Sequence, residues 1–333
     1  MITKLSVAVV QGGPSSEAEV SRASAAGVAK ALETAGHRVD RIELDRGLPA
    51  ALVAGGFDVV FPVVHGAVGE DGSLQGLLEV LAIPYVGCDV LASALAMDKR
   101  VARVLFEAAG LPVAKGIAFP RGASDGAAGA ALRARTEIGR RLVVKPGANG
   151  SAIGVSRLEE DAPDDEVARA IAAVWELGDV ALVEHFAKGK EVTCGVLDVG
   201  PHARALPPTE VRSPNDAFYT FEARYAPGRS EHFCPAPLGD ALVKRVQEIA
   251  VAAHVALGCR DLCRVDFVVG DANETDVVTL LEVNTMPGFT ATSLYPEAAA
   301  VAGIDFPTLC DGFVVRAHTR GTKARNAPRH FPG

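Results

Sequence analysis

Apolar runs of strand length alternate with helix-periodic segments in the first part of the chain. Three runs that end at turns or loops are predicted as strands, at residues 5–10, 39–44 and 59–64. Residues 17–35 repeat apolar side chains at helical spacing and stop at Gly36, which predicts a helix capped by that glycine. Strands separated by helix-length segments are typical of a parallel α/β sheet. Such sheets bind ligands at the carboxyl ends of their strands, so the loops after Val10 and Val64 are the first candidates for a site.

A different pattern follows Met97. Residues 99–110 are predicted as a helix that a Leu-Pro pair ends, and the Gly- and Ala-rich residues 121–131 are expected to form a surface connection. Further strands are predicted at residues 141–145, 180–184, 191–199, 263–269 and 277–283. The last three of these predict an antiparallel arrangement.

The composition of the 333 residues is that of an ordinary globular protein, with 49% hydrophobic and 22% charged residues. This length is too great for one compact core and suits two or three domains. The formal net charge of −8 argues against a nucleic-acid partner, because binding to a phosphate backbone needs a basic face. A small local site with a metal ion is a better way for such a chain to hold phosphate.

Two other features favour a cytoplasmic protein with no membrane partner. The start of the chain lacks the small-residue cleavage site of a signal peptide, and no apolar run is long enough to cross a bilayer. The six cysteines form no CxxC pair, and Cys259 and Cys263 lack a second pair that would complete a zinc site. We therefore expect reduced, buried thiols.

The segment QGGPSSEAEVS, residues 11–21, follows the first predicted strand. Its glycine pair permits a tight turn and close approach of a ligand, but the segment is no GxGxxG fingerprint, so a dinucleotide is not indicated. Ser16 and Glu19 have the spacing of a capping box, which leaves Glu17 available for a ligand. A carboxylate there suits an ammonium group, and it would equally complement the helix dipole.

Two glycine-rich loops carry further candidates. His65 ends a predicted strand and enters a loop with Glu70 and Asp71, where it can contact a polar ligand or hydrogen-bond to backbone. Lys145 leaves a strand and enters PGANGSAIG, whose backbone amides can surround phosphate oxygens while the lysine supplies a charge. This loop could also be a mobile hairpin tip, but the strand-anchored lysine favours a functional interpretation.

The segments CRVDFVV and LLEVNTMPG, residues 263–269 and 280–288, combine strand patterns with inward polar residues. Glu282 and Asn284 share one strand face, and Asp266 on a neighbouring strand can meet them there. Two carboxylates and a carboxamide form a hard oxygen site suited to Mg²⁺, which bridges nucleotide phosphates. A purely structural interpretation would need a partner for each polar group on otherwise apolar strands.

In this order the motifs resemble those of the D-alanine–D-alanine ligases, a family with the ATP-grasp fold. The resemblance runs from about Val7 to Leu309 and rests on seven ordered blocks: GGPSSEAEVS, HGAVGEDGSLQG, ALAMDK, VVKPGANGSAIGVS, FEARY, RVDF and LEVNTMPGFTATSLYP. It implies a multidomain protein of the α/β and α+β classes. An N-terminal parallel α/β domain, residues 1–98, would precede an ATP-grasp unit of two α+β subdomains with antiparallel sheets, residues 99–187 and 188–319. We expect residues 320–333 to be a disordered tail.

The resemblance also implies the ligands and the residues that hold them. ATP would be bound by Lys99 and Lys145 at its phosphates, and by these residues at its adenine and ribose: Glu184, His185, Ala187, Glu191 and Phe218, with Arg224 nearby. Two Mg²⁺ ions, for which Mn²⁺ could substitute, would be held by Asp266, Glu282 and Asn284. The family is usually dimeric, so a homodimer is expected.

For the amino acids, the resemblance implies that Glu17 receives the ammonium of the first D-alanine, with His65 beside it. Ser151 and Tyr225 would join Glu17 in a hydrogen-bonded group that closes a loop over the site. Arg264 and the backbone amide of Gly288 would stabilise the oxyanion of a tetrahedral intermediate. Ser293 and Leu294 would hold the carboxylate of the second substrate. The reaction implied is the ATP-dependent ligation of two D-alanines through D-alanyl phosphate, for peptidoglycan synthesis.

Two positions depart from the family pattern, since His185 and Arg224 stand where lysines are common. Tyr225 is retained, whereas relatives that make D-alanyl-D-lactate tend to lack it, so an amine acceptor is favoured. The alternatives are another amino-acid ligase, including one that makes D-alanyl-D-lactate or uses D-serine, a carboxylase of the same fold, and a non-catalytic nucleotide-binding regulator.

Overall fold

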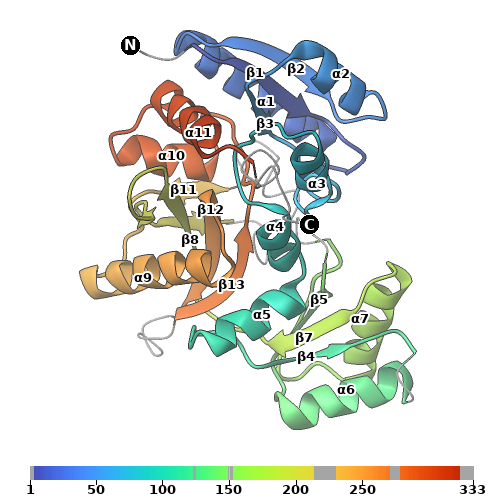
Figure 1. The fold of residues 1–333 in the computed structure, drawn as a ribbon. Coiled ribbons are helices and arrows are strands. Elements are labelled where there is room, and N and C mark those ends of the chain that lie inside the picture. The colour runs from blue at the N-terminus through green and yellow to red at the C-terminus, as the bar shows by residue number, and fades with distance from the viewer. Residues whose placement is uncertain are drawn as a thin grey trace, which may run out of the picture.

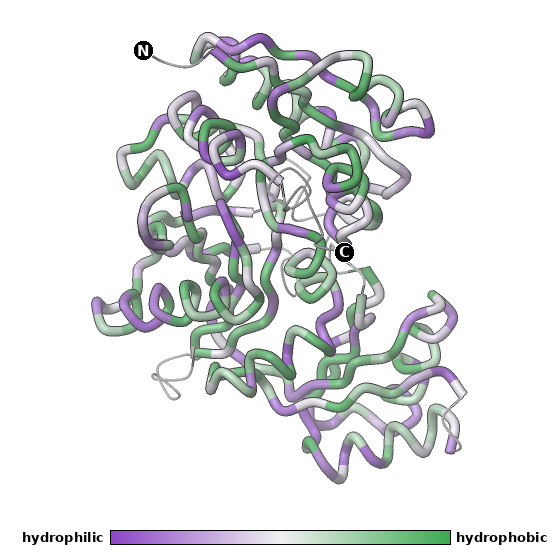
Figure 2. Tube along the Cα trace, viewed as in Figure 1, coloured by the Kyte–Doolittle hydropathy of each residue, from purple (hydrophilic) through white to green (hydrophobic). Residues whose placement is uncertain are grey.

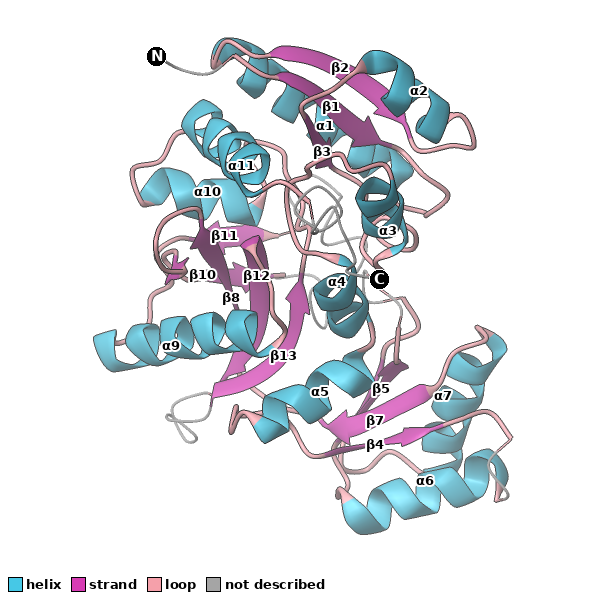
Figure 3. Cartoon of the chain, in the orientation of Figure 1, coloured by secondary structure: helices cyan, strands magenta, loops and turns pink. Residues whose placement is uncertain are grey.

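Three β-sheets, each built from a separate stretch of the chain, organise the computed structural model (Figures 1 and 3). The structure describes residues 4–122, 125–148, 150, 153–213, 230–270 and 278–322. We call the sheets the N-terminal, middle and C-terminal sheet in the order in which the chain forms them. Together with their helices they confirm the predicted mixture of a parallel α/β sheet and antiparallel α+β sheets.

The N-terminal sheet is parallel, with the strand order β2-β1-β3. Its strands are β1 (Ser6–Gln11), β2 (Arg38–Glu43) and β3 (Val59–Pro62), and its helices are α1 (Ala18–Thr34), α2 (Leu48–Gly55) and α3 (Ser73–Val80). The central strand β1 is buried on both faces, which accounts for its continuous apolar sequence. The three strands and the first helix predicted for this region are confirmed to within two residues.

The middle sheet is antiparallel, with the order β4-β7-β5-β6. Its strands are β4 (Gly116–Phe119), β5 (Leu142–Pro146), β6 (Ser156–Leu158) and β7 (Ala181–His185), and helices α6 (Gly126–Glu137) and α7 (Asp164–Glu176) pack beside it (Figure 1). The expected surface connection over residues 121–131 is wrong in its second half. Alanine has the highest helix propensity, and Ala130 and Ala131 are buried in the core that α6 forms with α7.

The C-terminal sheet has a five-strand path in the order β11-β10-β8-β12-β13, with β9 paired to β8. Its strands are β8 (Lys190–Asp198), β9 (Arg204–Ala205), β10 (Thr209–Arg212), β11 (Glu231–Phe233), β12 (Asp261–Val269) and β13 (Val278–Asn284). Helix α9 (Asp240–Ala256) covers one face, and Figure 2 shows hydrophobic and hydrophilic positions alternating along it. The opposite face of β12 and β13 carries the polar side chains of Arg264, Asp266, Glu282 and Asn284 beside apolar ones such as Val268.

Four further helices connect or cover the sheets: α4 (Val90–Met97), α5 (Lys99–Ala108), α10 (Leu294–Val301) and α11 (Phe306–Arg320). Helix α11 packs against α1, so the end of the described chain completes the N-terminal layer (Figure 1). Within the described ranges, no single helix has the length and apolar character needed to cross a membrane. Helices α10 and α11 reach both only as a pair, and they are bent by 104° at the break between them.

Phe289 lies at the centre of the core that joins the N-terminal sheet to the last two helices. Its ring centroid is 5.6 Å from that of Phe61 on β3 and 6.0 Å from that of Phe313 on α11. It also lies 5.8 Å from Tyr295 and 5.7 Å from Phe306. Since Phe289 is fully buried, it connects the segment after β13 to two other layers of the protein.

We predict that Phe289→Ala lowers the free energy of unfolding by about 3 to 5 kcal/mol, because the truncation leaves a cavity among four aromatic rings. Urea denaturation followed by fluorescence and circular dichroism would measure it. Val80→Ala is the control, because Val80 is 83% exposed. A loss as small as that of the control would contradict a central packing role for Phe289.

Candidate active site

Polar side chains from β12 and β13 meet on one face of the C-terminal sheet. The register pairs Arg264 with Asn284 and Asp266 with Glu282, so the four side chains share this face. Arg264 donates through Nε and Nη2 to the two carboxylate oxygens of Asp266, at 2.8 Å each. Asn284 Nδ2 donates to Asp266 Oδ2 at 3.1 Å, and the hydroxyl of Thr193 on β8 donates to Oδ1 at 2.7 Å. The register therefore brings together the three residues predicted as metal ligands.

A β-bulge shapes the same face. The pairing shifts beyond Asp266, so that Phe267 pairs with Leu280 and Leu281 is left as the extra residue. Leu281 and its neighbour Glu282 consequently line one cavity, although successive residues of a regular strand point to opposite faces. Strict alternation along β13 does not predict this apolar contribution.

Buried and half-buried ion pairs hold two lysines in position. Lys99 begins α5, and its Nζ lies 3.1 Å from Glu282 Oε2. Lys145 on β5 places its Nζ 2.5 Å from Oε2 of Glu184 on β7, while Arg103 Nη1 lies 2.7 Å from Glu184 Oε1. Glu184 is only 4% exposed, and the cost of burying its charge is offset by the two cations that contact it.

A cavity of about 190 Å³ lies between the middle and C-terminal sheets. We call it the larger cavity. Its walls include apolar side chains of both sheets, and one end carries Arg264, Asp266 and Glu282. Predicted site residues that line it are Lys99, Lys145, Glu184, His185, Ala187, Glu191, Arg264, Asp266, Glu282 and Leu294. An apolar slot that ends in charges of both signs suits a ligand with a flat ring at one end and anionic groups at the other.

A smaller cavity adjoins the larger one. It is lined by Gly66, Glu70, Ala96, Met97, Lys99, Gly150, Glu282, Val283, Asn284 and Thr285. Lys99, Gly150 and Glu282 line both cavities, so the two meet beside the ion pair of Lys99 and Glu282. A ligand in each cavity could therefore react at this junction.

Glu17 lies beside the smaller cavity, at the start of α1. A Cβ atom added to Gly66 would lie 3.3 Å from Glu17 Oε2, and one added to Gly150 would lie 4.0 Å from it. Gly66 also has a φ of +74°, a conformation that other residues rarely adopt. The two glycines therefore leave room next to a carboxylate that is itself only 8% exposed.

The capping box predicted for α1 is wrong. The helix begins at Ala18 with Glu17 as its N-cap residue, and Glu19 instead pairs with Arg22 on the helix surface. Ser15 instead makes the side-chain hydrogen bonds just before this helix. Its Oγ accepts from the backbone N–H of Glu17 at 3.3 Å and donates to the carbonyl of His65 at 2.8 Å. The loop after β3 is thereby tied to the start of α1.

His65 and Glu70 have strongly altered acid–base behaviour. Burial lowers the pKa of His65, although the nearby charge of Glu17 opposes this, so the ring is neutral near pH 7. Its Nδ1 lies 3.1 Å from the carbonyl of Met286 and must donate there, while Nε2 has no hydrogen-bond partner among the described residues. Burial raises the pKa of Glu70 to about 8, with the Gly66 N–H lowering it and Glu17 raising it further. Glu70 can therefore exchange a proton near neutral pH.

Three more predicted residues lie at the start of α10. Ser293 is the N-cap residue of this helix, and its Oγ accepts from the backbone N–H of Thr290 at 3.0 Å. A Cβ atom on Gly288 would approach Ser293 Oγ to 3.3 Å, so this glycine lies against the helix start. Leu294 lines the larger cavity together with Arg264. The positive end of the α10 dipole thus lies beside that cavity.

Four predicted residues, Ser151, Phe218, Arg224 and Tyr225, lie outside the described residues. Their contacts, and the loop closure that involves Ser151 and Tyr225, stay predictions.

Two residues in contact with the site residues are absent from the sequence prediction. Arg103 sits in an amphipathic helix whose charged positions resemble a solvated face, yet it is 6% exposed and holds Glu184. Thr193 sits within an apolar strand, and only its position opposite Asp266 in the β8–β12 register reveals its contact. A possible sequence signal is the alternation of Glu191 and Thr193, the two polar residues on that face of β8.

Two family models match the chain, "D-ala D-ala ligase C-terminus" over residues 105–315 and "D-ala D-ala ligase N-terminus" over residues 48–88. The chain belongs to the D-alanine–D-alanine ligase family. The D-alanine–D-alanine ligase of Acidiphilium cryptum is 44% identical over 316 residues, which cover 94% of this chain and 99% of that protein. The enzyme of Anaeromyxobacter sp. (strain K) is 45% identical over 306 residues, covering 92% and 94%.

Solved structures of the family have the same architecture. The ligase from Coxiella burnetii has a TM-score of 0.78 at 29% identity and covers 95% of this chain and 96% of its own. The ligase from Bacillus anthracis, complexed with ATP, has a TM-score of 0.79 at 28% identity, with coverage of 95% and 98%. These similarities confirm the fold predicted from the motifs. The predicted boundaries at 98/99, 187/188 and 319/320 stay a prediction.

We predict that Glu70→Gln flattens the dependence of stability on pH. The pKa of Glu70 is about 8 in the folded protein and near 4.3 in an unfolded chain. Between these values the folded protein holds a proton that the unfolded chain has released, so the free energy of unfolding falls as pH rises. Glutamine carries no such proton. Urea midpoints measured from pH 5 to pH 8 should decline less in the variant.

Glu33→Gln provides the matched control, because Glu33 is an exposed residue on α1. The Glu33→Gln variant should show the same dependence of stability on pH as the parent protein. If the urea midpoints of the parent, Glu70→Gln and Glu33→Gln decline with pH at the same slope, the pKa of Glu70 is not raised in the folded protein.

Proposed function

We propose that this chain ligates two D-alanine molecules into D-alanyl-D-alanine, converting ATP to ADP and phosphate, as a cytoplasmic step of peptidoglycan synthesis. Membership of the family supports the reaction. The observation that carries the proposal is the junction of the two cavities at Lys99 and Glu282, where a nucleotide phosphate and an amino-acid carboxylate can meet.

ATP occupies the larger cavity in this proposal. Its apolar walls receive the adenine, with Glu184, Glu191 and the backbone of Ala187 beside the base and ribose. His185 lines the same cavity and supplies a weaker contact than the lysine common in relatives. Lys99 and Lys145 are already directed by their ion pairs and contact the phosphates. The ligase of Bacillus anthracis, solved with ATP, supports this assignment.

Asp266, Glu282 and Asn284 fit a magnesium site. They offer two carboxylates and a carboxamide oxygen from one face of paired strands, and hard oxygen donors are those that Mg²⁺ prefers. These residues would hold two ions, or Mn²⁺ in their place, and the bound metal would neutralise charge on the phosphates and so reduce repulsion of an anionic nucleophile. Arg264 and Lys99, which pair with these carboxylates, lie close enough to share that task.

The smaller cavity and the start of α1 hold the first D-alanine. The carboxylate of Glu17 receives its ammonium, and the neutral His65 offers the unpaired Nε2 as a further acceptor. Gly66 and Gly150 leave space for the substrate beside this carboxylate. In the proposed pose the substrate carboxylate points toward Lys99, where it attacks the γ-phosphorus of ATP and ADP leaves.

The second step consumes the acyl phosphate. The amine of the second D-alanine attacks the acyl carbon, and the oxyanion that forms is stabilised by the Arg264 guanidinium and the Gly288 N–H. Collapse of this intermediate expels phosphate. Ser293 and the start of α10 hold the second carboxylate, since a helix N-terminus favours an anion. Ser151 and Tyr225 would shield the intermediate from water in the proposed closed state.

The reaction predicts one product. Incubation of the protein with ATP, Mg²⁺ and a mixed pool of D- and L-amino acids and D-lactate should release phosphate and yield D-alanyl-D-alanine, identified by mass spectrometry. Glu282→Gln should lower kcat by about 10²-fold or more, because it removes a charge beside the transferred phosphate.

The control for that variant is Glu176→Gln, since Glu176 is exposed at the end of α7 and lines neither cavity. If the main product is a depsipeptide or a different dipeptide, the second substrate is not D-alanine, and this proposal is wrong. Nucleotide binding without any ligated product would instead favour a non-catalytic nucleotide-binding regulator.

We also propose a homodimer, as is usual in the family. Light scattering of the purified protein at micromolar concentration should give a mass near twice 34.5 kDa. A mass of one chain, with ligase activity retained, would contradict this.

A further inference from the structure

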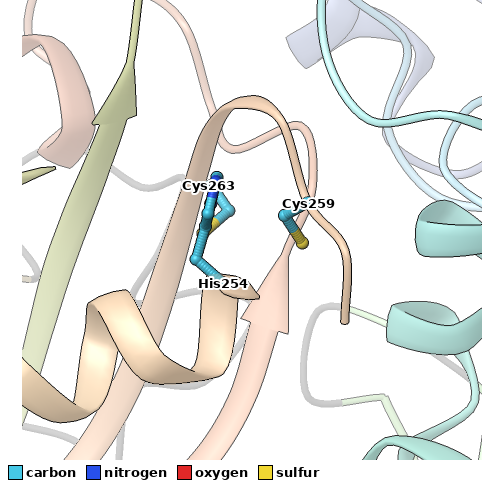
Figure 4. A group of neighbouring side chains, drawn as sticks. All are labelled: His254, Cys259 and Cys263. Atoms are coloured by element: carbon cyan, nitrogen blue, oxygen red, sulfur yellow. The ribbon is translucent and has the colours of Figure 1, made fainter. Parts of the chain in front are cut away.

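Three cysteines and a histidine meet under the C-terminal sheet. His254 comes from the last turn of α9, Cys259 from the turn that follows and Cys263 from β12 (Figure 4). Their ligand atoms all lie within 4.8 Å of one another, and His254 Nδ1 is 3.3 Å from Cys263 Sγ. Cys88 adds a third thiol, because its Sγ lies 3.8 Å from the carbonyl oxygen of Arg260 and 3.9 Å from that of Leu262, on the segment that joins Cys259 to Cys263. We call these four residues the sulfur cluster.

Cys88 lies far in sequence from the other three residues and is held beside them by hydrogen bonds between side chains and backbone. The carboxylate of Asp261 accepts from the Gly87 N–H at 2.8 Å, and Arg260 Nε donates to the Gly87 carbonyl at 2.8 Å. Arg320 Nη2 donates to the Tyr85 carbonyl at 2.7 Å. This network fixes the segment before Cys88 against the start of β12, so the approach of the thiols is imposed by the fold.

The sulfur cluster has the donor set of a soft metal site. Its side chains are 3%, 2%, 8% and 0% exposed for Cys88, His254, Cys259 and Cys263. Three thiolates and one imidazole form a common tetrahedral ligand set for Zn²⁺. His254 Nε2 lies 3.5 Å from Asp198 Oδ2, and a carboxylate in this position is the usual partner of a metal-binding histidine. A search for CxxC pairs does not find this set. Cys259 and Cys263 are four residues apart, Cys88 is distant in sequence, and the fourth ligand is a histidine.

We propose that the sulfur cluster binds one thiophilic divalent cation of the Zn²⁺ class. This site is separate from the oxygen donors of the cavities. Cys263 and Arg264 are neighbours on β12 and so face opposite sides of the sheet. Binding connects α9, β12 and the segment at Cys88, and it stabilises the strand that carries Arg264 and Asp266. The inference stands independently of the proposed ligase reaction.

Titration with Co²⁺ tests the site directly. Reduced, metal-free protein in excess Mg²⁺, which occupies oxygen sites, should develop thiolate-to-Co²⁺ charge-transfer absorption and the visible bands of tetrahedral Co²⁺, saturating at one ion per chain. Added Zn²⁺ should remove these bands, and it should raise the Tm of the protein. Asp198→Asn should weaken Zn²⁺ binding by about 10- to 100-fold while leaving the bands in place.

Cys259→Ser is the decisive variant, since Cys259 lies in a turn and is the most exposed of the four. It should lose the charge-transfer bands and the increase in Tm, with an unchanged circular dichroism spectrum. Cys310→Ser is the matched control, because Cys310 is a fully buried cysteine on α11 outside the cluster. It should behave as the parent protein does.

Two results would overturn the proposal. One is the absence of charge-transfer bands in the parent protein, or equal bands in Cys259→Ser and Cys310→Ser. The other is ready conversion of the cluster to a disulfide by a mild thiol oxidant, detected as a loss of two hydrogens by mass spectrometry, in protein that binds neither Co²⁺ nor Zn²⁺. That result would assign the cysteines to a redox pair.

Discussion

The pairing of β12 with β13 is the constraint on which the site depends. Its register places acidic and basic side chains on one sheet face, while α9 buries the other face in an apolar core. Three carboxylates of the cavities are each paired with a cation: Asp266 with Arg264, Glu282 with Lys99, and Glu184 with Lys145. These pairs make the buried charges tolerable and also hold the cations in place. When phosphates enter the site, these cations exchange a carboxylate partner for a phosphate, which demands little reorganisation of the protein.

Each of the three sheets contributes different residues to this site. The C-terminal sheet supplies the oxygen donors, the middle sheet supplies Lys145 and Glu184, and the loops of the N-terminal sheet supply Glu17 and His65. Met286 links two of these parts, since its carbonyl accepts from His65 just after β13 ends. The amino-acid side of the site is therefore continuous with the strand that carries Glu282.

Much of this was predictable from local patterns. Apolar runs located the longer strands, and period-two alternation placed Glu282 and Asn284 on one face. Five short strands, β4, β6, β9, β10 and β11, were not predicted. Contacts set by tertiary packing were not predictable in the same way. The charged pattern of α5 does not show that Arg103 faces Glu184, and the spacing of Ser16 and Glu19 does not show that Ser15 contacts the His65 carbonyl instead. Such contacts depend on segments far apart in sequence.

The bulge at Leu281 has a consequence for how β13 tolerates length changes. Leu280 lies in the core beneath the sheet, whereas Leu281 and Glu282 both line the larger cavity. Deleting Leu281 would restore regular pairing and leave Glu282 opposite Asp266, but it would remove an apolar side chain from the wall of the larger cavity. Deleting Val283 would instead turn Asn284 toward the apolar layer against α9, because a shift of one residue moves the following side chains to the opposite face of the sheet.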